Sequence, residues 1–256
     1  MNEATANMAV GGTVGKAGWK LFECESATST NDLARDLPAW GAVRADIQNG
    51  GRGRVGRVFV SDHGGLWISA VLPADGGLEK WAGFSLMVGV HLVRMLEDLN
   101  IPSARLRWPN DLMSGPQKLG GLLIEQSAKE VLVVGFGLNI SNAPWTCDPA
   151  LEAISTSIAR ITPSVPSVDE MAVRTLDALA DAHQAMEVGG MTAAIDELNL
   201  RWSRPVPVEI SLAGGETVSG RFVGLDSRGN LRLLDNITDS EFLVGHQSIE
   251  KLSELY

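Results

Sequence analysis

The sequence has few cysteines and a deficit of positive charge. Its 256 residues include two cysteines, Cys24 and Cys147, which lie in no CxxC or metal-ligand spacing. We therefore expect neither a disulfide framework nor a zinc site, and this usage fits a reducing, cytoplasmic location. Lys plus Arg number 21 against 31 Asp plus Glu, a net charge of −10. Such a surface should repel nucleic acid and anionic membranes, so neither is expected as a partner.

Several catalytic and targeting signatures are also missing. The sequence contains no HExxH, no paired histidines and no complete GxSxG, which excludes the corresponding zinc peptidases and serine hydrolases. No run of 18 apolar residues occurs, and the N-terminus lacks a basic region followed by an apolar one. Neither a membrane span nor a signal peptide is therefore expected.

Hydrophobic patterning predicts an α+β protein. Residues 1–18 show no periodicity and are expected to be a mobile tail, residues 19–203 one large domain, and residues 204–256 a smaller one. In the large domain we expect strands at 19–25, 43–47, 66–72, 119–125 and 131–138, and helices at 29–37, 81–99, 168–188 and 192–202. Ser29 and Ser167 should open capping boxes. The last two strands should pair antiparallel, and short strands after Pro205 predict a small β-barrel.

The most unusual stretch is 48–57, which holds three arginines and four glycines. Glycines let backbone N–H groups approach a ligand, and guanidinium groups bind phosphate or carboxylate in a bidentate way. The stretch matches GxGxxG, but β-prone residues follow where a dinucleotide site needs a helix, and the chain has no HRD or DFG segment of a kinase. We interpret it as an anion-binding loop.

Two later stretches place polar groups beside glycines. Residues 107–112 carry a cation, an amide and a carboxylate around Pro109, and Lys118 precedes the pair Gly120-Gly121 at the start of a strand. Residues 135–139 again combine glycines in an apolar strand with a terminal asparagine. Loops at strand ends commonly carry sites. Cations, an apolar slot and one carboxylate suit activation of a carboxylic acid by a nucleotide, where positioning and electrostatics provide most of the catalysis.

Together these stretches resemble the biotin protein ligase family, biotin–[acetyl-CoA-carboxylase] ligase. The motifs that carry the resemblance, in family order, are Ser29-Thr30-Asn31, Gln48 with 51–57, Trp108-Pro109-Asn110-Asp111-Leu112, Lys118-Leu119-Gly120-Gly121 and Gly135-Phe136-Gly137-Leu138-Asn139. They span about 110 residues. The resemblance implies a mixed, largely antiparallel sheet with packed helices, as in class II aminoacyl-tRNA synthetases and biotin ligases, followed by an SH3-like C-terminal domain.

The resemblance also implies a reaction and its participants. Biotin and Mg-ATP would give biotinyl-5′-AMP, from which biotin passes to a lysine of a biotin carboxyl carrier protein. The cofactors implied are ATP, biotin and Mg²⁺, and the assembly would be a monomer or homodimer. With 28 residues before Ser29, we expect a monofunctional enzyme without an N-terminal DNA-binding domain.

Site residues follow by the same resemblance. The biotin slot would be lined by Ser29, Thr30, Gln48, Gly51, Arg52, Gly121, Leu123, Gly135 and Gly137. Asn31, Gly53 and Trp108 belong to the matching motifs and are also expected at the binding site. Lys118 would contact the activated carboxylate and the α-phosphate. Arg54 and Arg57 would assist with phosphates, Asn110 and Asp111 with the nucleotide or Mg²⁺, and Asn139 with the adenylate.

Two positions depart from the family pattern. Phe59 stands where the family often has tryptophan, and its ring could still close over the adenylate. Arg107 replaces the usual lysine; it keeps the charge, but its fork is larger and not equivalent. Two alternatives remain open. One is a lipoate protein ligase, against which the arginine-glycine loop argues, and the other is a non-catalytic biotin- or nucleotide-binding module.

Overall fold

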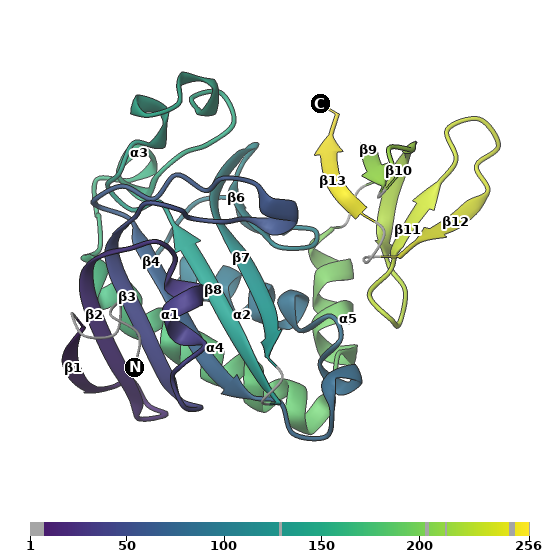
Figure 1. Ribbon diagram of the computed structural model, residues 1–256. Coiled ribbons are helices and arrows are strands. Elements are labelled where there is room, and N and C mark those ends of the chain that lie inside the picture. The colour runs from purple at the N-terminus through teal and green to yellow at the C-terminus, as the bar shows by residue number, and fades with distance from the viewer. Residues whose placement is uncertain (1–7, 128–129, 203–204, 213, 246–248, 256) are drawn as a thin grey trace. The chain divides into compact units, whose positions relative to one another are not determined.

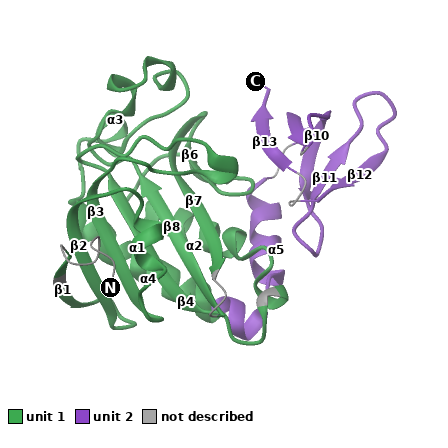
Figure 2. Ribbon diagram, viewed as in Figure 1, with its two compact units in different colours: residues 1–184 green, residues 185–256 purple. Residues whose placement is uncertain are grey.

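The computed structural model describes residues 8–127, 130–202, 205–212, 214–245 and 249–255. These residues form two compact units, 1–184 and 185–256, shown in Figure 2. The units divide inside a long helix, whereas the sequence predicts a boundary after residue 203. The two boundaries describe different things, because the units are divided by compactness and the predicted domains by function. The predicted domain boundary therefore stays a prediction.

Unit 1 is built on one eight-stranded mixed sheet (Figure 1). Its strands are β1 (Ala9–Val14), β2 (Trp19–Ala27), β3 (Gly41–Gln48), β4 (Leu66–Pro73), β5 (Ala104–Arg107), β6 (Asp111–Ser114), β7 (Gln117–Ser127) and β8 (Val131–Leu138). They lie in the order β1-β2-β3-β4-β8-β7-β6-β5, in which only the pair β2-β3 is parallel. The predicted mixed, largely antiparallel sheet and the β7-β8 hairpin are confirmed.

Helices cover the two faces of this sheet. Its helices are α1 (Thr30–Ala34), α2 (Phe84–Asp98), α3 (Ile158–Ile161) and α4 (Val168–Gly189), of which α4 crosses the unit boundary. Short 3₁₀ turns span Arg54–Gly56, Leu78–Trp81, Pro144–Thr146 and Pro149–Leu151. Figure 1 shows α1 in front of the sheet and α2 and α4 behind it. The apolar residues of α2 pack over β5, β6 and β7, and the apolar run of β4 is buried along nearly its whole length.

The two expected capping boxes had different outcomes. Ser167 Oγ accepts a hydrogen bond of 3.1 Å from the backbone N–H of Glu170, so the cap of α4 is confirmed. Ser29 precedes α1 as its N-cap residue, but its side chain makes no capping hydrogen bond. The capping box predicted there is wrong, because α1 has only five residues and its first turn faces other polar groups.

The N-terminal segment also differs from expectation. Residues 9–14 form strand β1, paired antiparallel with β2. No periodic pattern marks this strand because Gly11 and Gly12 interrupt it, and its register shifts between Val10 and Gly12. Residues 9–14 are thus part of the sheet, where the sequence predicts a mobile tail, and residues 1–7 lie outside the described part of the chain.

Unit 2 contains the end of α4, helix α5 and a five-stranded antiparallel sheet. Its elements are α5 (Thr192–Arg201), β9 (Val206–Leu212), β10 (Thr217–Leu225), β11 (Leu231–Leu234), β12 (Glu241–Val244) and β13 (Ile249–Glu254), with strand order β12-β11-β10-β9-β13. The side-chain amide of Asn199 bonds both backbone groups of Leu225 and so ties α5 to β10. In the described residues β12 and β13 do not pair, so a closed SH3-like barrel stays a prediction.

Candidate active site

The register of β7 and β8 places the predicted motifs beside one another. Gly121 pairs with Gly137, and Leu123 pairs with Gly135. The N-terminus of α1 lies against the second pair, because a Cβ at Gly135 would collide with Asn31 Oδ1. Phe59 lies against the first pair, because a Cβ at Gly137 would lie 2.7 Å from its ring. Close approach of other groups therefore requires glycine at these positions. The two residue pairs, two positions apart along the ladder, bring the separate motifs together.

A charged cluster lies at the β6-β7 end of the site. Lys118 Nζ lies 2.5 Å from Asp111 Oδ1, and Arg107 Nη2 lies 2.7 Å from Asp111 Oδ2. Burial alone would raise the pKa of Asp111, but the charges and hydrogen bonds of Lys118 and Arg107 outweigh burial and hold that pKa below its usual range. Asp111 is therefore ionised at neutral pH and neutralises part of the cationic charge.

Phe59 provides an aromatic wall for this cluster. Its ring centroid lies 5.5 Å from Lys118 Nζ, a cation–π distance, and 5.8 Å from the ring of Trp67 in an edge-on arrangement. A Cβ at Gly121 would lie 3.2 Å from Lys118 Nζ. The lysine therefore lies over a strand segment without side chains, next to the ring that was expected to close over an adenylate.

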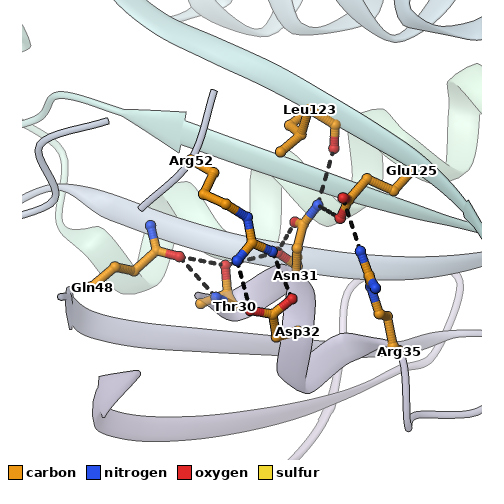
Figure 3. A network of polar contacts seen from close by, with 9 residues as sticks. Thr30, Asn31, Asp32, Arg35, Gln48, Arg52, Leu123 and Glu125 are labelled. Atoms are coloured by element: carbon orange, nitrogen blue, oxygen red, sulfur yellow. Dashed lines mark hydrogen bonds and ion pairs between the residues drawn. The ribbon is translucent and has the colours of Figure 1, made fainter. Parts of the chain in front are cut away.

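A network of uncharged and charged polar groups forms the other end of the site (Figure 3). Gln48 Oε1 accepts hydrogen bonds from the backbone N–H of Thr30 at 2.8 Å and from its hydroxyl at 3.0 Å. Asn31 Nδ2 donates to Glu125 Oε2 at 2.7 Å and to the Leu123 carbonyl at 3.4 Å. The residues predicted from the Ser-Thr-Asn motif and Gln48 are therefore brought together, with Leu123 beside them.

The arginine loop lies between these two ends. Its base is closed by backbone hydrogen bonds from Phe59 N to Gly51 O and from Gly53 N to Arg57 O, of 2.9 and 2.7 Å. Arg52 forms a two-point ion pair with Asp32, with N–O distances of 2.8 and 2.6 Å. Burial lowers the pKa of Arg54, opposed by the nearby charge of Asp111. Arg54 thus lies close enough to Asp111 for the charge of that carboxylate to affect its pKa.

Two other predicted residues make hydrogen bonds within the protein. Asn139 Nδ2 donates to the Thr156 carbonyl at 3.0 Å, and its Oδ1 accepts from Asn142 Nδ2 at 2.9 Å. Asn110 Nδ2 donates to the Leu122 carbonyl at 2.7 Å. Both amides hold neighbouring segments in place, and their predicted contacts with a nucleotide stay predictions. Trp108 is buried and precedes a cis peptide bond to Pro109.

Four residues of the site were not predicted. Asp32 and Glu125 pair with Arg52 and Asn31, while Ser61 and Ser69 bond Gln48 and Thr30. Ser69 could have been predicted from the sequence, because a hydroxyl in the apolar run 66–72 must find a buried partner. The other three lie on α1, in a loop and on β7, and spacing gives no comparable signal for them.

The described residues do not provide a protein-only metal site. No group of three or more His, Cys, Asp or Glu side chains in that part of the chain could hold an ion. Both carboxylate oxygens of Asp111 face cationic side chains, which opposes a divalent cation there. The arrangement therefore does not fit Asp111 as a Mg²⁺ ligand. The same described residues include no helix long and apolar enough to span a membrane.

Comparison with known proteins shows one matching family. The sequence model of the Biotin/lipoate A/B protein ligase family matches residues 21–139, the segment from β2 to the end of β8 that carries every motif described above. The match covers just under half of the chain. It agrees with the resemblance found in the sequence, since the matched segment holds the glycine pairs, the charged cluster and the polar network.

Individual proteins similar to this one match different shares of the chain. A biotin–[acetyl-CoA-carboxylase] ligase from Mycobacterium tuberculosis is 29% identical over 231 residues, covering 85% of this chain and 84% of the relative. A Bacillus subtilis bifunctional ligase/repressor BirA is 31% identical over 153 residues, covering 56% of this chain but only 47% of the relative. The aligned part thus spans about half the length of that family member.

A solved structure shares the fold. The biotin protein ligase from Aquifex aeolicus, in complex with biotin and ATP, superposes with a TM-score of 0.79 at 23% identity. The superposition covers 92% of this chain and 99% of that chain. This likeness confirms the α+β ligase fold expected from the sequence.

Proposed function

We propose that this protein is an ATP-dependent biotin ligase. It would form biotinyl-5′-AMP and diphosphate from biotin and ATP, and then transfer the biotinyl group to a lysine amine of a biotin carboxyl carrier protein, releasing AMP. The names of the family members support this reaction, since the Mycobacterium tuberculosis relative is a biotin–[acetyl-CoA-carboxylase] ligase. The complex of the Aquifex aeolicus enzyme with biotin and ATP supports the same pair of substrates.

The spacing between the two ends of the site is the observation that carries the proposal. The pair Leu123–Gly135 lies beside the polar network, and the pair Gly121–Gly137, two residues along the strand, lies beside Lys118 and Phe59. Two residues along a strand span about 7 Å. A polar ring at one end and a carboxylate at the other, joined by a short apolar arm, match this arrangement, and biotin has that composition.

Lys118 is the residue we assign to charge stabilisation. Its ammonium would bind the carboxylate of biotin and the α-phosphate, where negative charge develops as the anhydride forms. Asp111 and Arg107 would hold the ammonium in place, and Arg54 and Arg57 would contribute further positive charge for the phosphates. The amide-forming step then needs only a deprotonated carrier lysine close to the anhydride carbon.

Lipoate ligation is the alternative within the same family. Lipoate also offers a carboxylate, but its dithiolane ring has neither a carbonyl nor an N–H group. The network around Thr30, Asn31 and Gln48 would then face a ring that cannot pair with it, at the cost of unpaired polar groups. That network therefore favours biotin over lipoate.

Carrier labelling tests the proposal directly. The protein is incubated with ATP and a biotin carboxyl carrier domain, with biotin in one arm and lipoate in the other, and the carrier is weighed by mass spectrometry. We expect a biotin-sized mass increase that depends on ATP. A carrier that gains no mass with biotin would refute the proposal, and an increase with lipoate alone would establish the alternative.

The proposal extends to domains, assembly and location. We assign catalysis to residues 19–203 and carrier-related functions to residues 204–256, in a cytoplasmic monomer or homodimer. The net charge of −10 supports a protein partner in preference to nucleic acid. A filter-binding assay at low salt would detect nucleic acid, and light scattering would give the assembly state.

A further inference from the structure

Ser69 contributes the hydroxyl group of β4, and that group is completely buried beneath α1. Its exposed fraction is 0%. Its Oγ lies 2.7 Å from Thr30 Oγ1 and 2.6 Å from Asn31 Oδ1. A serine in this position connects the central strand of the sheet to the two residues that begin α1.

The direction of each hydrogen bond beyond Ser69 follows from donor chemistry. The backbone N–H of Thr30 can only donate, so the group of Gln48 that faces it at 2.8 Å must be the carbonyl Oε1. The amide nitrogen of Gln48 then faces Ser61 Oγ at 3.0 Å. Ser61 in turn donates to the Phe59 carbonyl at 3.0 Å. The orientation of the Gln48 amide is therefore fixed from both sides.

The same assignment of donors and acceptors determines the role of Ser69. The Thr30 hydroxyl donates to Gln48 Oε1 at 3.0 Å, so its oxygen can only accept from Ser69. Asn31 Nδ2 donates to the Glu125 carboxylate, which leaves Asn31 Oδ1, another acceptor, facing Ser69. The single proton of Ser69 thus serves two acceptors, and it starts a chain that runs in one direction to the Phe59 carbonyl.

We propose that Ser69 is a positioning residue for ring recognition, with Ser61 at the other end of the same chain. This inference rests on the proposed function. In this chain of hydrogen bonds, one N–H of the half-buried Gln48 amide faces Ser61 Oγ. The other N–H then points at a carbonyl oxygen of the ligand ring. A cyclic urea provides that carbonyl, whereas a dithiolane does not. Ser69 therefore determines specificity without touching the ligand.

Loss of the Ser69 hydroxyl has a defined consequence. Asn31 Oδ1 would then compete with Gln48 Oε1 for the one remaining hydroxyl proton, that of Thr30. The Gln48 amide would lose one of its two fixed donors and could rotate, so its N–H would no longer point steadily at the ring. Binding of ligands with a urea ring should weaken. The ATP site should change little, because the hydrogen-bond chain reaches it only through the backbone carbonyl of Phe59.

The experiment compares Ser69→Ala with the wild-type protein. We expect the KM for biotin and the Kd for desthiobiotin, which keeps the urea ring, to rise about 5- to 10-fold, the effect of one lost hydrogen bond. The kcat and the KM for ATP should change less than about twofold on the same reasoning. Ser61→Ala should act in the same direction. Ser69→Cys keeps a weak donor and should recover part of the affinity.

A matched control separates positioning from general stability. Thr175 also has a completely buried side chain, on α4, and its hydroxyl contacts Met95 Sδ and no residue of the site. Thr175→Val should lower the thermal midpoint without changing the KM for biotin. If Ser69→Ala fails to fold, Ser69→Cys and Ser61→Ala decide the question by the same constants.

The outcomes distinguish this inference from the proposed function. A wild-type protein that labels the carrier, together with folded serine variants whose constants for biotin and desthiobiotin are unchanged, would overturn the positioning role and leave biotin ligation intact. A parallel rise in the KM for ATP would overturn it too, since the effect would then be general. A wild-type protein that attaches no biotin would refute the proposed function itself.

Discussion

Lys118 and Asp111 form an ion pair between neighbouring strands, with Nζ 2.5 Å from Oδ1. Their backbones are held by the β6-β7 ladder, whose register shifts between Leu112 and Met113. The irregularity lies between the two charged positions, and bulges of this kind redirect side chains. The ammonium is therefore positioned by the sheet before any ligand arrives, and an incoming carboxylate or phosphate would share it with Asp111.

Lys118→Ala should reduce the single-turnover rate of carrier labelling by about 10²- to 10³-fold, the usual cost of losing one preorganised electrostatic contact. The fold should persist, because the side chain is partly exposed and packs mainly on Phe59. Lys20→Ala, on the exposed face of β2, is the matched control and should label normally. Unchanged labelling in the Lys118 variant would remove this residue from the mechanism.

Asp111 should make stability depend on acid pH. Burial would raise its pKa, but Lys118 and Arg107 hold the pKa below the usual value, so the folded protein binds the proton less readily than the unfolded chain. The stabilisation is therefore complete above about pH 4, the ordinary carboxyl range, and is lost as pH falls through the lowered folded value.

Asp111→Asn tests this pH dependence. At pH 6 we expect the variant to be less stable to urea by about 3 kcal/mol, because two cations lose their shared partner. The difference between variant and wild type should shrink as the pH falls from 4 to 2. A stability difference that stays constant over that range would show that the carboxylate is not preferentially ionised in the folded protein.

Gly135→Ala should abolish high-affinity biotin binding. The new methyl group would collide with Asn31 Oδ1 and displace the residue that Ser69 and Glu125 hold. Overpacking of this kind costs about 1–3 kcal/mol, so the Kd for biotin measured by calorimetry should rise at least about tenfold. Gly189→Ala is the control, since a Cβ there meets nothing within 4 Å and binding should be unchanged.

The stretches that form the candidate site could be identified in the sequence, but the contacts that support them could not. Glycines beside Lys118 and the arginine-rich loop are local patterns, so they could be read without the fold. The partners of Asn31 could not, because Glu125 is 94 residues away and meets it only through the order β3-β4-β8-β7. Strand β1 was not predicted for a different reason. Its glycines interrupt the alternation of apolar and polar residues by which a strand is recognised, and the strand forms through pairing with β2.

The Arg52–Asp32 ion pair should hold the base of the arginine loop in the free protein. Two valines of the loop are nonetheless exposed: Val55, at the tip, is 62% exposed and has a positive φ of 56°, and Val58, which forms a bridge with Arg52, is 84% exposed. Apolar side chains exposed beside a charged cluster are available to cover a ligand there. We therefore expect the loop to close over the adenylate and shield the anhydride from water.

Hydrogen exchange across residues 50–60 tests this closure. In the wild-type protein, exchange should slow when biotin and ATP are added, and most strongly at the tip. Asp32→Asn should speed exchange of the free loop while leaving the liganded state protected, because the ligand replaces the lost anchor. Arg174→Ala, which breaks an exposed pair with Glu170 on α4, should change neither state. Exchange that is equally slow with and without ligand would show that the loop is rigid and not a lid.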